Sequence, residues 1–311
     1  MGVTDTHQTP HVVYVFDAGF RYCTLVSAYS VLKYRPADIR ISFLAGQDMP
    51  EFARAAAALM RAFPDADIAL RPEPVLDLRF EIQGHLPPAT FGRLLLPQLV
   101  SGRVLYLDGD TFARRDIGPL FHADLHGRPF GAMRDPPIER DLHYVNLPLR
   151  AKVKPHLAAY LEHIELFDMA SYFNAGIMVI DLDRAAELGV LDDIFDLPAA
   201  VEFVRSHNFA HADQSWLNHK ARGQVALLDP IWNSLWGNPR TNRLPLPPRR
   251  QFAYRASRRD PAIVHLAGPV KPWLDHGKRL SRAMQRWNAE YCALMNEADR
   301  TLGLDLREML L

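Results

Sequence analysis

The sequence lacks the features that mark secreted or membrane-spanning chains. Only two of its 311 residues are cysteines, Cys23 and Cys292, which excludes a disulfide framework and favours a reducing compartment. No apolar run approaches the ~18–20 residues that are needed to span a bilayer. The polar start, MGVTDTHQTPH, has neither the basic region nor the apolar core of a secretory signal. We therefore expect a soluble protein of the cytoplasm.

An excess of charge of one sign is lacking as well. The chain has 36 basic and 36 acidic residues, so its formal net charge is zero and no overall field attracts nucleic acid. It also lacks internal repeats. With 311 residues it can bury a large core, and we expect one α/β domain over residues 1–275 followed by a helical C-terminal segment over residues 276–311.

What the chain does have is an alternation of apolar runs and helical patterns. The runs that we interpret as strands cover residues 12–17, 39–45, 67–70, 75–80, 104–107, 129–133, 177–182, 225–228 and 262–265. The helical patterns cover residues 25–32, 48–63, 90–100, 116–121, 201–206, 213–220, 278–297 and 302–311. The Pro-rich stretch 134–150 is predicted as an irregular loop over the site. This alternation predicts a mostly parallel central sheet with helices on both faces.

One of these runs ends in two acids. Residues 104–107 read Val-Leu-Tyr-Leu, which is typical of a strand buried on both faces, and Asp108, Gly109 and Asp110 follow. Side chains two residues apart in an extended chain point the same way, so the two carboxylates can converge on a hard divalent cation, Mg²⁺ or Mn²⁺. Gly109 permits a sharp bend and the close approach of a ligand. The alternative is a turn capped by two solvated aspartates, which Asp-Gly-Asp alone would favour.

Four short motifs, taken in this order, resemble the family-8 retaining glycosyltransferases, the group of glycogenin and the bacterial lipooligosaccharide α-galactosyltransferases. They are YLDGD at 106–110, YFNAG at 172–176, DQ at 213–214 and HLAGPVKPW at 265–273. The resemblance runs from Val12 to about Trp273. It implies a GT-A type nucleotide-sugar-binding domain that moves a hexose, galactose or glucose, from a UDP-sugar to a saccharide acceptor in the synthesis of lipopolysaccharide or another surface glycan.

The resemblance also implies a metal site. Asp108, Asp110 and His265 are its ligands, and Gly268 and Lys271 meet the diphosphate of the donor. An imidazole nitrogen favours Mn²⁺ over Mg²⁺, although Mg²⁺ stays an alternative. Glycine lets backbone approach a phosphate, and lysine supplies a point charge to a leaving diphosphate. A lone histidine would more often be a hydrogen-bonded core residue, but glycine and lysine at three-residue steps after His265 favour the ligand interpretation.

For the nucleotide end of the donor, Val15 and Asp17 match positions that contact ribose and uracil. Ala18 and Gly19 depart from the acidic and amide side chains that are usual there, so uracil is expected to be read by backbone groups and strict preference for UDP stays open. Further matches to donor-binding positions are His85, Thr90 and Arg93. The alternative for Arg93 is an exposed helix arginine.

For the sugar and the reacting carbon, the resemblance points to Asp135, Asn174, Asp213 and Gln214. Retention of configuration requires either an enzyme nucleophile or attack by the acceptor on the face that the diphosphate leaves. Gln214 lies where a nucleophile would be needed, and an amide is a poor one. We therefore favour same-face attack through an oxocarbenium-like state that Gln214 stabilises.

Two other functions compete with this interpretation. A haloacid-dehalogenase-type phosphohydrolase also has a strand ending in D-x-D, but there the motif opens the domain and a threonine stands two residues after the second aspartate. Here Thr111 follows Asp110 directly, and about a hundred residues precede the motif. The second competitor is a non-catalytic sugar-nucleotide binder. The intact set of Asp108, Asp110, His265 and Lys271 argues against it.

The acceptor side is less marked. A glycan or lipid-linked saccharide should contact residues 134–150 and 232–250, where Trp236 could stack on a sugar or anchor a lid. In the C-terminal segment, apolar residues at helical spacing stand beside basic ones: Leu280, Met284, Trp287 and Tyr291 beside Lys278, Arg279, Arg282 and Arg286. Such a helix can visit an anionic inner membrane face or pack its apolar side onto the domain. Both alternatives are kept.

Overall fold

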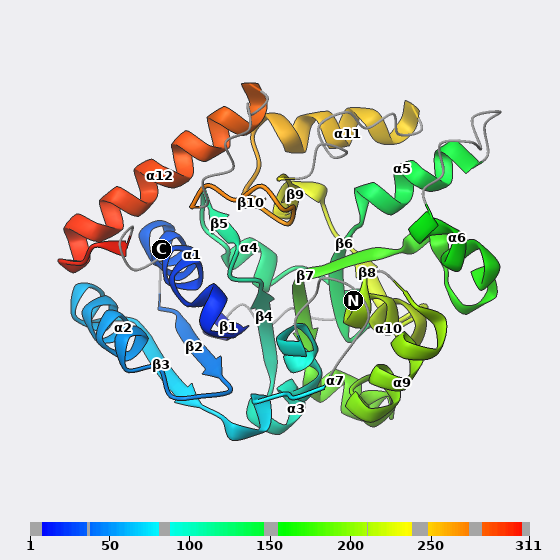
Figure 1. Ribbon diagram of the computed structural model, residues 1–311, viewed down its shortest axis with the longest axis horizontal. Coiled ribbons are helices and arrows are strands. Elements are labelled where there is room, and N and C mark those ends of the chain that lie inside the picture. The colour runs from blue at the N-terminus through cyan, green and yellow to red at the C-terminus, as the bar shows by residue number, and fades with distance from the viewer. Residues whose placement is uncertain are drawn as a thin grey trace.

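The computed structural model describes residues 8–35, 38–80, 88–145, 155–209, 211–237, 248–273 and 282–306 (Figure 1). Its centre is a seven-stranded sheet with the strand order β3-β2-β1-β4-β7-β6-β8. The strands are β1 (His11–Phe16), β2 (Arg40–Ala45), β3 (Asp67–Pro72), β4 (Arg103–Leu107), β6 (Phe130–Arg134), β7 (Phe173–Asp181) and β8 (Val225–Leu227). The long buried apolar runs of the sequence form the middle of this sheet, as predicted.

The direction of β7 decides where its first residues lie. Strands β3, β2, β1 and β4 are parallel to one another, and β8 is parallel to β6, whereas β7 is antiparallel to both β4 and β6. Leu107 at the end of β4 pairs with Ile177 near the start of β7. The beginning of β7 therefore shares an edge of the sheet with the carboxyl ends of β1, β4 and β6. The prediction of a mostly parallel sheet is confirmed.

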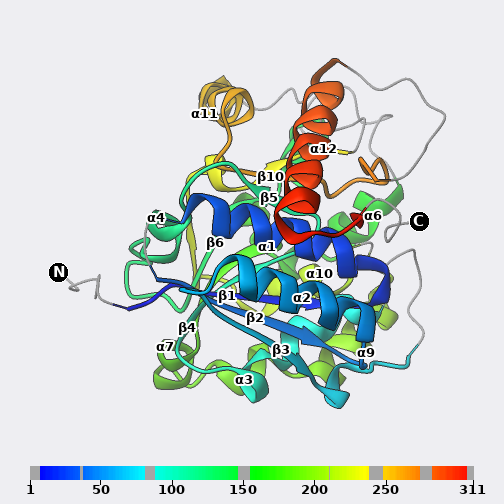
Figure 2. The same ribbon diagram turned by 90° about the vertical axis from the view of Figure 1, so that its left-hand side faces the viewer.

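Helices cover both faces of the sheet (Figure 2). On one face lie α1 (Arg21–Tyr34), α2 (Pro50–Ala62) and α12 (Arg282–Leu302). On the other lie α3 (Leu96–Leu99), α7 (Leu182–Glu187), α8 (Leu191–Ile194), α9 (Leu197–His207) and α10 (Ala212–Lys220). Each face has its own cluster of buried apolar side chains, which is the two-sided burial that the uninterrupted apolar strands require.

A second, three-stranded sheet stands beside the first. It has the order β5-β10-β9 and is formed by β5 (Thr111–Ala113), β9 (Ser234–Leu235) and β10 (Ile263–His265). Strands β10 and β5 are antiparallel, and His265 pairs with Thr111. This pairing places His265 next to Asp110, more than 150 positions earlier in the chain, and the amide of Leu266 donates to the carbonyl of Asp110 at 2.9 Å.

Some predicted elements were wrong, and prolines account for two of them. Residues 75–80 are not a strand: a 3₁₀ turn, η2 (Pro74–Leu76), starts at the proline and 77–80 have no regular structure. The predicted loop 134–150 begins with helix α5 (Pro136–Val145). Asp135 accepts the amide of Ile138 at 3.0 Å, so the two prolines stand in a capped first turn, where their missing N–H groups cost nothing. Residues 146–150 lie outside the described residues.

Two helix predictions need smaller corrections. The predicted helix 90–100 is mostly a 3₁₀ helix, η3 (Pro88–Leu95), followed by the single turn α3. The predicted helix 302–311 does not begin at residue 302, because α12 runs to Leu302 and Gly303 follows it with a φ of +66°, which suits a helix C-terminus. Residues 307–311 of that prediction lie outside the described residues. The other described helices are α4 (Gly118–Phe121), α6 (Pro155–Glu162) and α11 (Pro248–Arg259).

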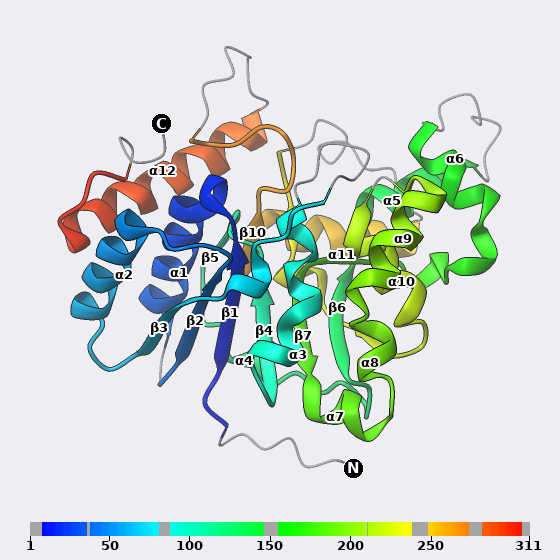
Figure 3. The same ribbon diagram turned by 60° about the horizontal axis from the view of Figure 1, so that its bottom comes forward.

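Helix α12 packs its apolar side onto the domain. It lies across α1 and α2 (Figure 3), and Met284, Trp287 and Tyr291 are all buried in the same apolar cluster as those helices. That face is therefore not available to a membrane, and the packing alternative is confirmed for it. Lys278, Arg279 and Leu280 lie outside the described residues. No helix among the described residues is both long and apolar enough to cross a membrane.

We expect Trp287→Ala to lower the free energy of unfolding by about 3–5 kcal/mol, because it empties a fully buried site between α12 and the domain. Urea denaturation measures the change. Asn296→Ala on the exposed side of the same helix is the control, with an expected effect within about 0.5 kcal/mol. Equal stability of the two variants would show that α12 does not form part of the core.

Candidate active site

The predicted acids lie at the edge of the main sheet where β4 ends. Asp108 directly follows β4, and its amide donates to the carbonyl of Gly176 in β7 at 2.7 Å. The amide of Thr111 donates back to the carbonyl of Asp108 at 3.3 Å, so residues 108–111 form a turn. Asp108 and Asp110 thus converge because the chain turns, and not through the alternation of an extended strand that we predicted.

His265 completes a cluster of three potential metal ligands. Its Nε2 atom lies 3.2 Å from Oδ1 of Asp110 and 3.8 Å from Oδ2 of Asp108. Potential ligand atoms of all three side chains lie within 4.8 Å of one another. Gly176 forms the floor, since a Cβ atom there would stand 2.3 Å from Cε1 of His265 and 2.6 Å from Oδ2 of Asp108. Two carboxylates and one imidazole form a donor set that fits Mn²⁺, and both Asp110 and His265 are buried.

Lys271 is the cation nearest to Asp110. Its Nζ atom lies 2.5 Å from Oδ2 of Asp110 and also donates to the carbonyl of Leu266. Burial alone would raise the pKa of Asp110, but Lys271 and His265 outweigh it and hold that pKa well below its usual range. The surroundings of Asp110 therefore favour its ionised form. Gly268 stands in the same loop, and its amide donates to the carbonyl of Trp236 at 3.1 Å.

Arg93 is buried between two carboxylates, so the alternative of an exposed helix arginine is wrong. Its Nη2 atom lies 3.1 Å from Oδ1 of Asp108 and its Nε atom 2.8 Å from Oδ2 of Asp213, and the guanidinium lies 4.6 Å from the ring centre of Tyr106. Burial raises the pKa of Asp213 to about 6, against the opposing attraction of Arg93. Asp213 is therefore close to its protonation midpoint in the weakly acidic range.

Asp135, Asn174 and Gln214 meet on the other side of the same edge. The amide nitrogen of Asn174 donates to Oδ2 of Asp135 at 3.3 Å and to Oε1 of Gln214 at 3.0 Å. Gln214 donates in turn to Oδ2 of Asp135 at 3.1 Å, and its oxygen also accepts the amide of Ala175 at 3.1 Å. Three of the four residues that the resemblance assigned to the sugar and the reacting carbon thus form one hydrogen-bonded group beside the metal ligands, and the fourth, Asp213, pairs with Arg93.

Sequence reasoning missed two side chains of this site. The hydroxyl of Tyr106 donates to Oδ1 of Asp108 at 2.8 Å. Asn233, which is 2% exposed, lies 3.0 Å from Nδ1 of His265 and donates to Oδ1 of Asn174 at 2.9 Å. Tyr106 could have been found as the residue two positions before Asp108 on the same strand. Asn233 gave no signal, because it is a single amide between a short turn and a two-residue strand.

The remaining predicted residues have other surroundings. Oδ1 of Asp17 accepts the amides of Gly19 and Phe20 at 2.9 and 3.2 Å and so caps a 3₁₀ turn, η1 (Ala18–Phe20). Val15 is largely buried at the end of β1, and Thr90 lies in η3, where its carbonyl accepts from Arg93 at 3.2 Å. A Cβ atom at Gly109 would stand 2.1 Å from Oγ1 of Thr24, so this glycine admits helix α1 rather than a ligand. His85 lies outside the described residues.

Trp236 is an anchoring residue and does not offer a free face. It is 4% exposed, Arg258 lies 3.6 Å from its ring centre, and Trp287 packs at 5.5 Å. Its indole N–H donates to Ser234 at 2.9 Å. Of the two alternatives for Trp236, the structure favours the lid anchor over sugar stacking.

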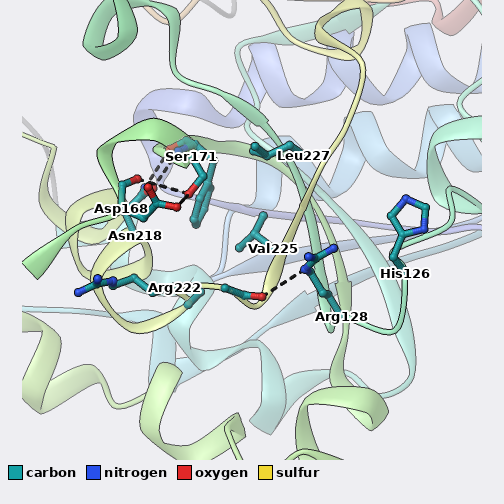
Figure 4. A pocket seen from close by; sticks show the side chains of 11 residues that line it. His126, Arg128, Asp168, Ser171, Asn218, Arg222, Val225 and Leu227 are labelled. Carbon is teal, nitrogen blue, oxygen red and sulfur yellow. Dashed lines mark hydrogen bonds between the residues drawn. The ribbon is translucent and has the colours of Figure 1, made fainter. Parts of the chain in front are cut away.

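A separate cavity of about 380 Å³ lies next to the edge strand β8 (Figure 4). His126, Arg128, Asp168, Asn218 and Arg222 are among its lining residues, and none of the predicted site residues lines it. Arg128 and Arg222 already donate to backbone carbonyls, of Gly223 and Glu165. We locate the active site at the carboxylate cluster, because the converging ionisable groups lie there and not in this cavity.

Comparison with known proteins shows the family to which the chain is related. The profile described as "Glycosyl transferase family 8" matches residues 11–277. General stress protein A of Bacillus subtilis (strain 168) is 25% identical over 202 residues, which cover 62% of this chain and 62% of that protein. Glycosyltransferase GlyF of Streptococcus pneumoniae serotype 4 is 26% identical over 205 residues, 65% of this chain and 42% of that protein. The match thus covers less than two thirds of either relative.

Solved structures share the fold. The bifunctional glycosyltransferase WbbM in its apo form superposes with a TM-score of 0.71 at 20% identity, over 94% of this chain and 52% of that chain. The galactosyltransferase LgtC in complex with donor and acceptor sugar analogues superposes with a TM-score of 0.65 at 22% identity, over 92% of this chain and 95% of that chain. At these identities the likeness establishes the GT-A type fold.

We expect the stability of the protein relative to its Asp213→Asn variant to rise as the pH falls from about 7 to about 4.5. In the folded protein Asp213 is mostly protonated below about pH 6. In the unfolded chain the same side chain stays mostly ionised until the pH falls to its ordinary pKa of 3.8. Protonation of Asp213 between these pH values removes the cost of a buried charge and so raises the free energy of unfolding by an amount on the order of 1–3 kcal/mol. The asparagine of the variant does not ionise, so its free energy of unfolding lacks this contribution. Urea denaturation of both proteins at the two pH values measures it. A difference that does not change with pH would contradict the shifted pKa.

Proposed function

The chain belongs to glycosyl transferase family 8, and from that premise we propose that it moves a hexose, galactose or glucose, from a UDP-sugar to a saccharide acceptor with retention of configuration. The observation that carries the proposal is the convergence of Asp108, Asp110 and His265 beside Lys271 at the carboxyl edge of the sheet. The fold shared with a galactosyltransferase solved with donor and acceptor sugar analogues supports it. We further propose that the acceptor is a glycan or lipid-linked saccharide of lipopolysaccharide or another surface glycan.

We propose that Asp108, Asp110 and His265 hold a divalent cation, Mn²⁺ in preference to Mg²⁺. The three ligand side chains support this assignment, and so does Gly176, whose lack of a side chain lets Asp108 and His265 approach each other. A cation bound there would supply Lewis-acid stabilisation to the leaving diphosphate. Because Lys271 pairs with Asp110 in the absence of a cation, the ammonium offsets the carboxylate charge until a ligand takes over that role.

The loop after β10 is proposed to receive the diphosphate. Lys271 is a mobile point charge on a four-carbon stem, and its present contacts with Asp110 and the Leu266 carbonyl can be exchanged for phosphate oxygens. Gly268, two residues after Leu266, is proposed to let the loop approach the diphosphate closely, although its own amide donates to the carbonyl of Trp236 at 3.1 Å. Negative charge grows on the leaving oxygen as the glycosidic bond breaks, so Lys271 stabilises the transition state more than the bound donor.

Gln214 and its partners are proposed to surround the reacting carbon. The acceptor hydroxyl forms its bond to the anomeric carbon on the face that the diphosphate leaves, the carbon–oxygen bond to phosphate breaks, and the hydroxyl proton passes to a diphosphate oxygen. Two N–H groups donate to the oxygen of Gln214. This supports our proposal that the amide stabilises positive charge through its dipole and does not act as a nucleophile. Asp213 pairs with Arg93, and we propose that Asp135 and Asn174 bind sugar hydroxyls.

The nucleotide end is proposed to lie at the carboxyl end of β1, with Val15 and Asp17 near ribose and uracil and with Thr90, His85 and Gly109 nearby. Asp17 is engaged by two backbone amides through one oxygen, so recognition of a uracil N–H would use the other. Arg93 is bound to two carboxylates, and its contribution to donor binding is proposed to act through Asp108. UDP is the nucleotide that we propose.

The family and the packing of α12 limit the alternatives that the sequence left open for function and location. Membership of family 8 removes the phosphohydrolase alternative. We keep as proposals the division into residues 1–275 and 276–311 and a location in the cytoplasm; both cysteines are free, and the family profile ends at residue 277. Contact with an anionic membrane is no longer proposed for the buried side of α12.

The function is tested by incubating the purified protein with a panel of UDP-sugars and Mn²⁺ and measuring release of UDP with and without saccharide acceptors. We expect release from UDP-galactose or UDP-glucose that an acceptor accelerates, with retained configuration in the product. Binding of a UDP-sugar without release or transfer would instead identify a non-catalytic binder. No binding of any UDP-sugar would contradict the proposal.

We expect Asp110→Asn to abolish both Mn²⁺ binding and UDP release, since the variant loses a ligand charge in a buried cluster. Isothermal titration with Mn²⁺ and the release assay measure the two effects. Asp192→Asn, an exposed carboxylate on α8, is the control and should behave as the unmodified protein does. Normal turnover by protein treated with EDTA would exclude a metal from the reaction.

We expect Lys271→Ala to lower turnover by about 10²–10³-fold and donor affinity much less, because the charge that Lys271 meets develops in the transition state. Lys271→Arg, which keeps a positive charge, should recover part of the rate. Rates at saturating donor and separate binding titrations distinguish the two quantities. An unchanged rate at saturating donor would remove Lys271 from the mechanism.

A further inference from the structure

We infer that Asn233 is a positioning residue that sets the tautomer of His265, through a chain of hydrogen bonds that begins at the backbone amide of Gly176. This inference deepens the proposed function, because it concerns the ring that would ligate the cation. Asn233 stands between a 3₁₀ turn, η7 (Pro230–Trp232), and β9, so it belongs to neither strand that carries the metal ligands.

The direction of the chain follows from one group whose role cannot be reversed. A backbone N–H only donates, and the amide of Gly176 donates to the side-chain oxygen of Asn174 at 3.1 Å. That fixes which end of the Asn174 amide is oxygen. The nitrogen end then donates to Asp135 and to Gln214, both of which accept, so the whole set is consistent with one orientation.

The orientation of Asn233 follows in the same way. It approaches the oxygen of Asn174 at 2.9 Å, and only its Nδ2 can donate there. Its oxygen therefore faces Nδ1 of His265 at 3.0 Å, and a neutral ring must carry its proton on Nδ1 to satisfy that oxygen. All three side chains are buried, so a reversed amide would leave two acceptors facing each other without water.

This arrangement decides whether His265 can serve as a ligand. With the proton on Nδ1, Nε2 is the ring nitrogen that faces Asp110 and Asp108, at 3.2 and 3.8 Å, and that a cation between the three side chains would bind. Ionised carboxylates can only accept, so by themselves they would draw the ring proton to Nε2 and block the ligand position. The oxygen of Asn233 competes with them for that proton, and it thereby presents the free Nε2 to an incoming cation.

The test compares Asn233→Leu with Asn233→Asp. Leucine fills a similar volume but offers no acceptor. Aspartate keeps an acceptor for the Nδ1 proton, but it adds a negative charge and places its second oxygen against the oxygen of Asn174, to which Asn233 donates. Ser234→Ala is the matched control. Ser234 is the buried neighbour of Asn233 on β9, and its hydroxyl accepts from the Trp236 indole, which is not part of the series of hydrogen bonds from Gly176 to His265.

Two measurements are made on each protein. Long-range ¹H–¹⁵N spectra of metal-free protein, at a pH at which the rings are neutral, report the tautomer of His265, which His265→Gln identifies among the 13 histidines. Titration calorimetry gives the Mn²⁺ affinity. We expect the Nδ1–H tautomer in the unmodified protein, in Asn233→Asp and in Ser234→Ala. In Asn233→Leu we expect a shift to Nε2–H and an affinity about 10–100-fold lower, which Asn233→Asp largely restores.

An Nε2–H tautomer in the unmodified protein would overturn the inference, and so would an Asn233→Leu variant that keeps both the Nδ1–H tautomer and the full affinity. If Asn233→Leu does not fold, the spectra of the unmodified protein and of Asn233→Asp still decide. The tautomer is measured without metal or donor, so failure to bind Mn²⁺ or to transfer sugar would count against the proposed function alone.

Discussion

The structure depends on how the repulsion between two neighbouring carboxylates is offset. Asp108 and Asp110 converge at the end of a buried strand, where water screens their charges poorly. Arg93 meets the first and Lys271 meets the second, and each cation comes from a different part of the chain. Arg93 is the more permanent of the two, since it is buried and also holds Asp213. We propose that Lys271 is the exchangeable one, which would give the site one fixed and one replaceable counter-charge.

The antiparallel strand β7 brings the metal cluster and the sugar side together. Because β7 starts where β4 and β6 end, its first residues lie between Asp108 and Asp135. Gly176 contributes its small size to the cluster and its amide to Asn174, and Asn174 joins Gln214 to Asn233. One short segment, residues 174–176, therefore contacts both the metal cluster and the amide side chains proposed for the sugar side. A shift of one residue in the register of β7 would move each of its side chains to the other face of the sheet and would dismantle both halves of the site.

Much of this could be predicted from the sequence, because strong local patterns carried it. Uninterrupted apolar runs marked the buried strands, and acids or a histidine directly after such runs marked Asp108 and His265. What failed depended on tertiary context. The prolines at 136–137 begin a helix because Asp135 caps it. A side chain at Gly109 would collide with Thr24 of helix α1. Asn233 owes its role to Asn174 and His265, which are 59 and 32 positions away in the sequence. No local pattern encodes such contacts.

The central claim is that Asp108, Asp110 and His265 bind the cation that the reaction uses, and that Lys271 is released from Asp110 to the diphosphate. Anomalous diffraction from crystals grown with Mn²⁺ and UDP tests both parts at once. The account predicts one strong manganese peak within bonding distance of the three side chains, with Nζ of Lys271 on a phosphate oxygen. A manganese peak elsewhere, or UDP bound with Lys271 still on Asp110 and no peak between the carboxylates, would contradict it.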